Sequence, residues 1–397
     1  MRFINSSLVL LVSASVLLST GHAFTPVSRS GVRSGKSSLC MSAALIVQNK
    51  GGGHGELGFQ LAKTLTDHPK ISSITILQDD ACKDSSEPFC SYATDIPNVK
   101  IVKAPLSSDD SMTADAMKEL LGGASFDYVW DNASKKPEGA GKAICDCAKE
   151  WGVKLYTYVS SAGMYQNPTQ FPMPETTPIK DSAGQAKQDQ YAVDLGLPLV
   201  SFRPQYIYGP KSNKHDYIDW YFDRLVRDLP LPIPADGTQK VSLTNAEDVA
   251  SLLASVLNDE QAAVSQRFFN CGTDQLHTYT DVAMMCAEAA GKDPASVNIE
   301  LYDADLFGKA TFPFRMTDFY VAPDMAKQTL GWTGPKHSLQ GDLTDYYQSY
   351  VARGGPTKQM SLVKDWEIVF GSTSQFAVRS VYDQYDPLVI DTSEVNQ

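Results

Sequence analysis

The sequence has 397 residues, 43% of them hydrophobic, and a formal net charge of −12 at pH 7. This length is ample for a sizeable core and predicts one large α/β unit with a smaller lobe. The acidic balance argues against a general polyanion binder, because contacts to phosphates need clustered Lys and Arg side chains. Any nucleic-acid site must therefore be a local patch.

The first 41 residues have the composition of a targeting segment. Residues 1–23 combine a basic start, a short apolar stretch and a small residue at Ala23, which is typical of a signal peptide. Residues 24–41 are rich in serine, contain basic residues and lack acidic ones, which is typical of a plastid transit peptide. With Phe24 directly after Ala23, the two segments resemble the two-part plastid targeting signal of algae with secondary red plastids, such as diatoms. We expect the mature protein in the plastid stroma; plain secretion is the alternative.

The mature chain is expected to be strongly acidic and free of membrane spans. Removing residues 1–41 takes away four basic residues and no acidic one, which leaves a formal charge of about −16. Later apolar stretches are too short to cross a bilayer, so we expect no membrane association.

Apolar stretches alternate with helical patterns over residues 42–210, which indicates a parallel sheet. The fold class is therefore α/β, with a Rossmann-type doubly wound parallel sheet in an NAD(P)-binding-like domain. Six strands are expected, at Ala43–Val47, Ile74–Leu77, Val99–Val102, Phe126–Trp130, Leu155–Val159 and Leu199–Phe202.

The second half of the chain has a looser pattern. Residues 211–371 predict a smaller C-terminal lobe of the substrate-binding type that partly returns to the main sheet. Val249–Leu257 and Tyr279–Ala290 have helical patterns within it. Residues 372–397 form a polar, acidic tail.

A glycine-rich turn follows the first expected strand and opens a helix. In it, two residues separate Gly52 from Gly55 and two separate Gly55 from Gly58. Glycines at this place let backbone N–H groups approach a pyrophosphate at the helix N-terminus. Asp79 comes just after the second strand, where an acid holds a ribose hydroxyl of NAD and disfavours the 2′-phosphate of NADP; the alternative is a solvated loop acid ahead of Lys83. NAD is the expected cofactor; the alternative is a turn that kept its glycines for geometry alone.

No Tyr-x-x-x-Lys pair, the acid/base of short-chain dehydrogenases, occurs anywhere in the sequence. Ser161 closes the fifth strand, where extended members of that group carry a serine that bonds the substrate oxygen. Lys187 is the nearest candidate lysine, but Ala183 stands four residues before it. A register offset by two pairs Asp181 with Gln185 instead. Neither register supplies a phenol as general acid.

Six cysteines follow the leader, and none has a metal-site or Cys-x-x-Cys spacing. We expect buried thiols and no metal; a redox-sensitive pair of Cys82 and Cys90 is the alternative.

A local group of cations and aromatics follows the sixth strand. The nominated cations are Lys211, Lys214, Arg224 and Arg227. Aromatic side chains between them could stack unpaired bases while the cations meet phosphates, which predicts an RNA site. The alternative is an amphipathic helix with a core face.

Several strings together resemble one family, over about residues 43–370. They are Asn49–Phe59, Asp131-Asn132, Ser160–Gly163, Phe202–Tyr206, Trp220–Asp228, Pro232–Pro234, Phe269–Cys271, Phe312–Arg315 and Leu330–Trp332. They are similar to the chloroplast stem-loop-binding proteins, here in an algal secondary-plastid form. These proteins are atypical extended short-chain dehydrogenases of the NAD-dependent epimerase/dehydratase superfamily.

The resemblance implies binding to plastid stem-loop RNA, in mRNA or rRNA, or to the ribosome. It also implies a weak endoribonuclease activity, support of transcript stability and plastid translation, and a homo-oligomer or a hetero-oligomer with a paralogue. One alternative is a nucleotide-sugar epimerase, dehydratase or reductase acting through Ser161 and Lys187. Another is a non-catalytic scaffold that retains NAD.

Overall fold

The computed structural model describes residues 42–48, 53–108, 110–212, 217–307 and 313–360, together with Leu362, Asp365 and Ile368. The predicted signal peptide, transit peptide and polar tail lie outside these residues. By its internal contacts the chain divides into Met1–Leu39 and Cys40–Gln397, and all described residues belong to the second unit.

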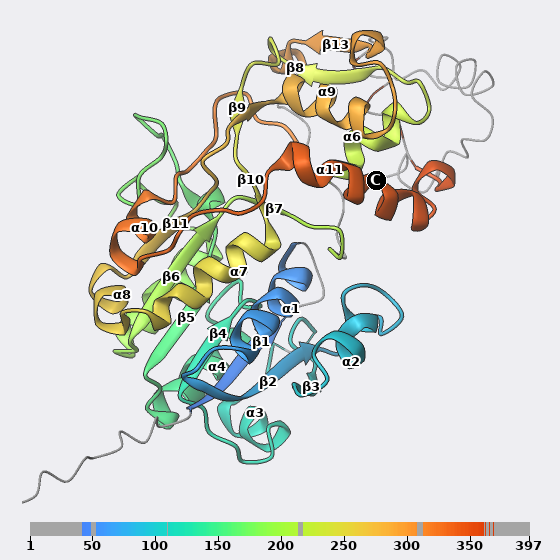
Figure 1. The fold of residues 1–397 in the computed structure, drawn as a ribbon. Coiled ribbons are helices and arrows are strands. Elements are labelled where there is room, and N and C mark those ends of the chain that lie inside the picture. Colours follow the sequence, from blue (N-terminus) through green and yellow to red (C-terminus); the bar gives the residue numbers. More distant parts are fainter. Residues whose placement is uncertain are drawn as a thin grey trace, which may run out of the picture. The chain divides into compact units, whose positions relative to one another are not determined.

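The centre of this unit is a parallel sheet (Figure 1). Within the described residues seven strands follow the order β11-β6-β5-β4-β1-β2-β3. Their bounds are β1 (Ser42–Gln48), β2 (Ile71–Asp79), β3 (Lys100–Ala104), β4 (Tyr128–Asp131), β5 (Leu155–Val159), β6 (Leu199–Pro204) and β11 (Phe268–Cys271). The order reverses between β1 and β4, which makes a topological switch point there. The six predicted strands and the doubly wound fold class are confirmed.

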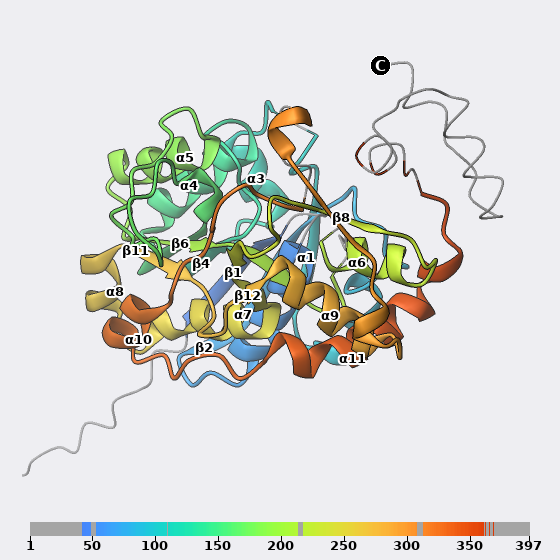
Figure 2. The same ribbon diagram turned by 90° about the horizontal axis from the view of Figure 1, so that it is seen from above.

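Helices cover both faces of the sheet, and Figure 2 shows the two groups on opposite sides of it. On one face lie α1 (Gly53–Thr66), α7 (Ala246–Ala254), α8 (Glu260–Gln266) and α10 (Asp324–Leu330); on the other lie α3 (Ala114–Leu120), α4 (Ala140–Trp151) and α5 (Gly184–Asp194). Alternate residues of β1 serve the two layers. Ala44 and Ile46 pack with the first group, and Leu45 and Val47 with the second.

The smaller lobe has its own core, built around α6 (Ile218–Leu225), α9 (Tyr279–Ala289) and α11 (Leu339–Ala352). The same half of the chain contains the short strands β7 (Tyr206–Tyr208), β8 (Leu231–Pro234), β9 (Lys240–Val241), β10 (Leu243–Asn245), β12 (His277–Thr278) and β13 (Ile299–Tyr302). The short helix α2 (Tyr92–Asp95) belongs to the first half of the chain. The chain leaves the main sheet after β6 and returns to it with α7 and β11.

β11 was not predicted as a strand. It pairs in parallel with β6, and Phe269 stacks on Phe202 with ring centroids 5.4 Å apart. Four residues directly after a helix are too few to show a periodic pattern, so only the tertiary pairing reveals this strand.

Candidate functional site

The first turns of α1 lie at the switch point of the sheet. α1 begins at Gly53, so Gly55 and Gly58 fall within its first two turns, while Gly52 lies outside the described residues. A Cβ atom at Gly58 would stand 1.9 Å from Oε1 of Gln48, the last residue of β1. The missing side chain at Gly58 therefore allows the helix to lie close against the strand.

Asp79 is the last residue of β2 and is fully buried. Its Oδ1 accepts a hydrogen bond of 2.9 Å from the backbone N–H of Ala81. Its Oδ2 is buried and has no hydrogen-bond partner among the described residues. An orphan carboxylate oxygen at the carboxyl end of a strand fits a ribose hydroxyl, which would supply the missing donor.

Glu56 is a buried carboxyl group that the sequence interpretation missed. It lies in the first turns of α1, only 1% exposed, and accepts hydrogen bonds of 3.2 Å from Gln60 Nε2 and from the backbone N–H of Lys211. Burial raises the pKa of Glu56 to about 7, although both hydrogen bonds oppose this. A single acid in a glycine-rich turn gives no sequence signal of such contacts.

Ser161 and Lys187 are not brought together as an acid/base pair. The Ser161 Oγ accepts a hydrogen bond of 3.0 Å from the N–H of Gly163 and caps a short 3-10 turn. Lys187 lies on the exposed side of α5. In the other register, Asp181 is exposed and Gln185 is half-buried. Neither residue is a tyrosine or a lysine, so this register also lacks the acid/base pair.

Tyr165, which follows Ser161, is held by other residues. Its hydroxyl donates to Asn270 Oδ1 at 2.7 Å and accepts from Arg203 Nη1 at 3.2 Å. Burial raises the pKa of Tyr165 to about 12, against the effect of the Arg203 charge. These contacts make Tyr165 a packing residue and leave its proton committed to Asn270.

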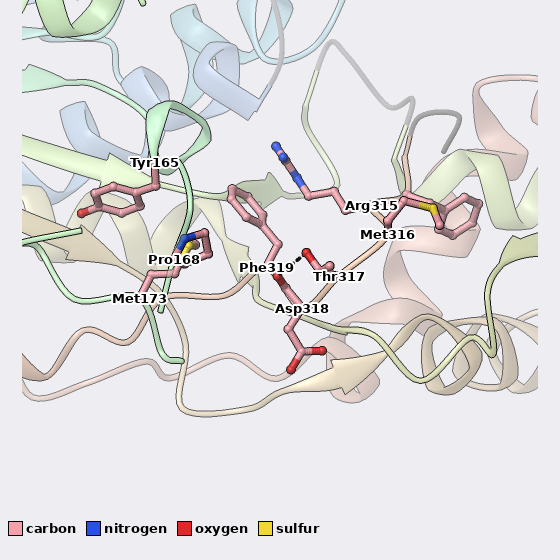
Figure 3. A pocket seen from close by; sticks show the side chains of 9 residues that line it. Tyr165, Pro168, Met173, Arg315, Met316, Thr317, Asp318 and Phe319 are labelled. Carbon is pink, nitrogen blue, oxygen red and sulfur yellow. Dashed lines mark hydrogen bonds between the residues drawn. The ribbon is translucent and has the colours of Figure 1, made fainter. Parts of the chain in front are cut away.

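A cavity of about 310 Å³ lies beside Tyr165 (Figure 3). Its walls include Met173, Arg315 and Phe319, and the Arg315 guanidinium stacks on the Phe319 ring at 3.6 Å. The Nε atom of Arg315 is buried and has no acceptor among the described residues. Asp318 and Thr317 also line the cavity, so an acid accompanies the guanidinium, and the cavity suits a ligand that has both an anionic group and a hydrogen-bond donor. The sequence singles out Arg315 only as part of Phe312–Arg315, one of the stretches that resemble the chloroplast stem-loop-binding proteins.

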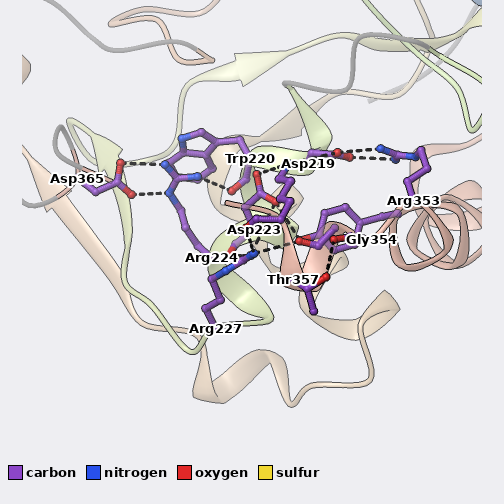
Figure 4. A network of polar contacts seen from close by, with 12 residues as sticks. Asp219, Trp220, Asp223, Arg224, Arg227, Arg353, Gly354, Thr357 and Asp365 are labelled. Carbon is purple, nitrogen blue, oxygen red and sulfur yellow. Dashed lines mark hydrogen bonds and ion pairs between the residues drawn. The ribbon is translucent and has the colours of Figure 1, made fainter. Parts of the chain in front are cut away.

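The nominated RNA-binding cations differ from the exposed patch that was expected (Figure 4). The Arg224 side chain is 6% exposed, binds Asp365 and donates to the carbonyl of Trp220. The Arg227 side chain is 11% exposed and donates to the carbonyls of Asp223, Gly355 and Lys358. The expectation of exposure is thus wrong for these two, because acceptors one helical turn away and others more than 120 positions away surround them. Contact with RNA stays a prediction.

Lys211, another nominated RNA-binding cation, is partly exposed but already has an acidic partner. Its Nζ lies 3.1 Å from Glu87 Oε1 and 2.7 Å from Ser91 Oγ, and its side chain keeps 31% exposure. Lys214 lies outside the described residues.

Within the described residues, neither the cysteines nor the candidate metal ligands form a further site. Cys145, Cys147, Cys271 and Cys286 are buried thiols, Cys82 is half-buried and Cys90 exposed, all free of disulfide bonds. Across the described residues, no three His, Cys, Asp or Glu side chains come together as metal ligands would. The same part of the chain contains no helix long and apolar enough to span a membrane.

The doubly wound sheet and the glycine-rich turn at its switch point indicate the class of protein, and comparison with known sequences identifies that class. Residues 52–272 match the NAD dependent epimerase/dehydratase family, and the chain belongs to it. Within that class, the chain is 29% identical over 286 residues to the chloroplast stem-loop binding protein of 41 kDa b of Arabidopsis thaliana. The match covers 71% of this chain and 72% of that protein, which confirms the predicted resemblance.

Other relatives are enzymes of nucleotide sugars. A trifunctional UDP-glucose 4,6-dehydratase/UDP-4-keto-6-deoxy-D-glucose 3,5-epimerase/UDP-4-keto-L-rhamnose-reductase of Arabidopsis thaliana is 23% identical over 68% of this chain and 42% of its own length. The NAD complex of dTDP-glucose 4,6-dehydratase from Bacillus anthracis has a TM-score of 0.60 at 15% identity, over 79% of this chain and 98% of that one. UDP-glucuronic acid 4-epimerase from Bacillus cereus with NAD also scores 0.60 at 15% identity, over 78% and 99%. These structures establish a shared fold.

Proposed function

We propose that this protein is a plastid RNA-binding protein that uses an epimerase/dehydratase scaffold without its hydride-transfer chemistry. Its ligand is stem-loop RNA, in mRNA or rRNA, and it supports transcript stability and translation. One observation carries the proposal: the chain is similar to a stem-loop binding protein over most of its length. The absence of a Tyr-x-x-x-Lys pair agrees with it, because a scaffold without that pair lacks the family's proton transfer; α5 does contain Lys187 and Tyr191, but the lysine precedes the tyrosine. A weak endoribonuclease activity is part of the proposal, without assigned residues.

The RNA contact is placed at the segment between β7 and α6, which carries Lys211 and Lys214. Lys211 is the nominated cation that keeps partial exposure in the described part of the chain, and Phe59 lies under its ammonium group at 5.6 Å from the ring centroid. On an acidic protein such a contact must be local. Its strength must depend on salt, because each phosphate contact releases counterions.

The test is the binding of a labelled stem-loop RNA at several salt concentrations, followed by fluorescence anisotropy. Neutralising Lys211 and Lys214 together should weaken binding and lower the salt slope by roughly one unit per lost phosphate contact. A matched control neutralises Lys100 on β3 and Lys149 on α4, two exposed lysines outside this segment, so that the same net charge is removed. Equal losses in both double variants, or binding that ignores salt, would contradict this site.

A dinucleotide site is the second part of the proposal. Gly52, Gly55 and Gly58 would hold the pyrophosphate of NAD against the start of α1, and the free oxygen of Asp79 would bind the ribose. When bound, NAD supplies a hydride acceptor in this fold. A chain without the acid/base pair would keep NAD for stability or for sensing rather than for turnover. A non-catalytic scaffold that only retains NAD is a further alternative.

The nucleotide-sugar enzyme remains the alternative, and the cavity at Arg315 favours it. The guanidinium stacked on Phe319 offers an anion-binding group, and Asp318 in the same lining offers an acceptor for a sugar hydroxyl. Tyr165, which is close in sequence to Ser161, lines the same cavity. Binding of UDP or a UDP-sugar that is lost in Arg315→Ala, together with turnover, would support this alternative.

A further inference from the structure

Glu56 lies where the dinucleotide site and the smaller lobe meet. Its carboxyl group extends from the first turns of α1 to the Gly209–Lys211 segment, which leads from β7 into the smaller lobe. A Cβ atom at Gly209 would stand 2.0 Å from Glu56 Oε2, so the glycine makes room for the carboxyl group. Glu56 is therefore seated in a tight cradle made partly of backbone.

One acidic and one basic side chain, Glu87 and Lys211, act on Glu56. On α1 itself its partner is the neutral amide of Gln60. From the segment before α2 comes Glu87, and from the β7–α6 segment comes Lys211. The Lys211 ammonium lies 3.1 Å from Glu87 and 3.9 Å from Asp95. Burial favours the neutral form of Glu56, and the Glu87 charge adds to this, while the hydrogen bonds and the Lys211 charge oppose it.

We propose that binding of a dinucleotide at the glycine-rich turn is coupled to uptake of a proton by Glu56. The inference rests on the dinucleotide site of the proposed function. Glu56 lies between Gly55 and Gly58, and one helical turn rises only about 5.4 Å. An ionised Glu56 would compete with the pyrophosphate for the positive end of α1 and would repel it through a poorly screened interior. A protonated Glu56 removes both effects.

The sign of the pH dependence follows. The form that binds best carries the proton, so affinity is highest below about pH 7 and falls as Glu56 ionises. If the complex raises the pKa of Glu56 by one to two units, affinity falls about five- to tenfold between pH 6 and pH 8. NAD itself has no group that titrates in this range.

The experiment is isothermal titration calorimetry of the full chain with NAD at pH 6, 7 and 8. At pH 7 it is repeated in two buffers of different ionisation enthalpy, which counts the protons taken up. The wild type should take up a fraction of a proton at pH 7. Glu56→Gln keeps an acceptor for the Lys211 N–H and should bind with similar affinity at all three pH values, without proton uptake. His54 lies two residues away, and His54→Gln should keep the wild-type pH dependence.

The outcomes separate the two proposals. Binding by the wild type without proton uptake overturns the inference and leaves the dinucleotide site standing, even if Glu56→Gln does not fold. Equal pH dependence in the wild type and Glu56→Gln does the same. No binding by either protein at any pH overturns the dinucleotide site and this inference with it.

Discussion

Arg224 and Asp365 form a two-point ion pair, with Nε 2.6 Å from Oδ2 and Nη2 2.8 Å from Oδ1. The guanidinium also stacks on Trp220, 3.8 Å from the ring centroid. The pair joins α6 to a segment far along the chain, and both side chains are largely buried.

The first prediction concerns the stability that this pair provides. Asp365→Ala should lower the free energy of unfolding by about 3 kcal/mol, because it leaves a buried guanidinium without its carboxylate. Urea denaturation of the two proteins measures this. The exposed pair Lys103–Asp84 is the control, and Asp84→Ala should cost less than about 1 kcal/mol. Similar losses in both variants would show that the Arg224 contact is a solvated one.

The second prediction concerns cofactor choice. NAD should bind at least about tenfold more tightly than NADP, since the buried Asp79 would repel a 2′-phosphate. Gly55→Val should abolish binding of both, because a side chain there would block the approach of the pyrophosphate to the helix. Fluorescence or calorimetric titration with both cofactors is the measurement. Equal affinities for NAD and NADP would remove the role given to Asp79.

The third prediction concerns catalysis. No hydride-transfer turnover should occur with nucleotide sugars, because Ala183 and Asp181 stand at the two positions where the catalytic tyrosine would be expected. The measurement follows absorbance of the reduced cofactor with UDP- and dTDP-sugars at high protein concentration. Robust turnover that disappears in both Ser161→Ala and Lys187→Met would replace the RNA-binding proposal by the enzyme.

The fourth prediction concerns pH and His337. Partial burial lowers the pKa of His337, but its contact with Asp342 at 3.1 Å and the charges of Asp248 and Glu247 outweigh this and raise it. A raised pKa gives stability that is fully present below about pH 6.5 and is lost as pH rises through the folded-state value. His337→Gln should therefore lower the free energy of unfolding at pH 5.5 by up to about 1 kcal/mol, and by less at pH 8.5. An equal effect at both pH values would mean that the imidazole charge contributes nothing.

The sequence predicts the main sheet well because its strands are buried on both faces. Runs such as Ala43–Val47 stay apolar for both layers, and the glycine turn marks where the first one ends. β11 escapes this reasoning, since its four residues become a strand only by pairing with β6.

The candidate site shows the opposite balance. The stretch around Arg224 stands out in the sequence because cations and aromatics alternate there. The sequence does not reveal that Asp365, 141 positions away, neutralises the guanidinium. Glu56 went unnoticed for the same reason, because its partner Lys211 is 155 positions away. Charges near one another in sequence predict a surface patch only when no distant partner of opposite charge packs on them.

The return of the chain to its main sheet also affects how the protein is made. During synthesis from the N-terminus, β1 to β6 emerge before α7 and β11 exist. Until then the apolar side of α1 lacks its cover and the edge of β6 lacks its neighbour. Pairings over such long sequence separations form slowly, and open edges invite aggregation in the meantime. We therefore expect the nascent first half to be the form of this chain that aggregates most readily.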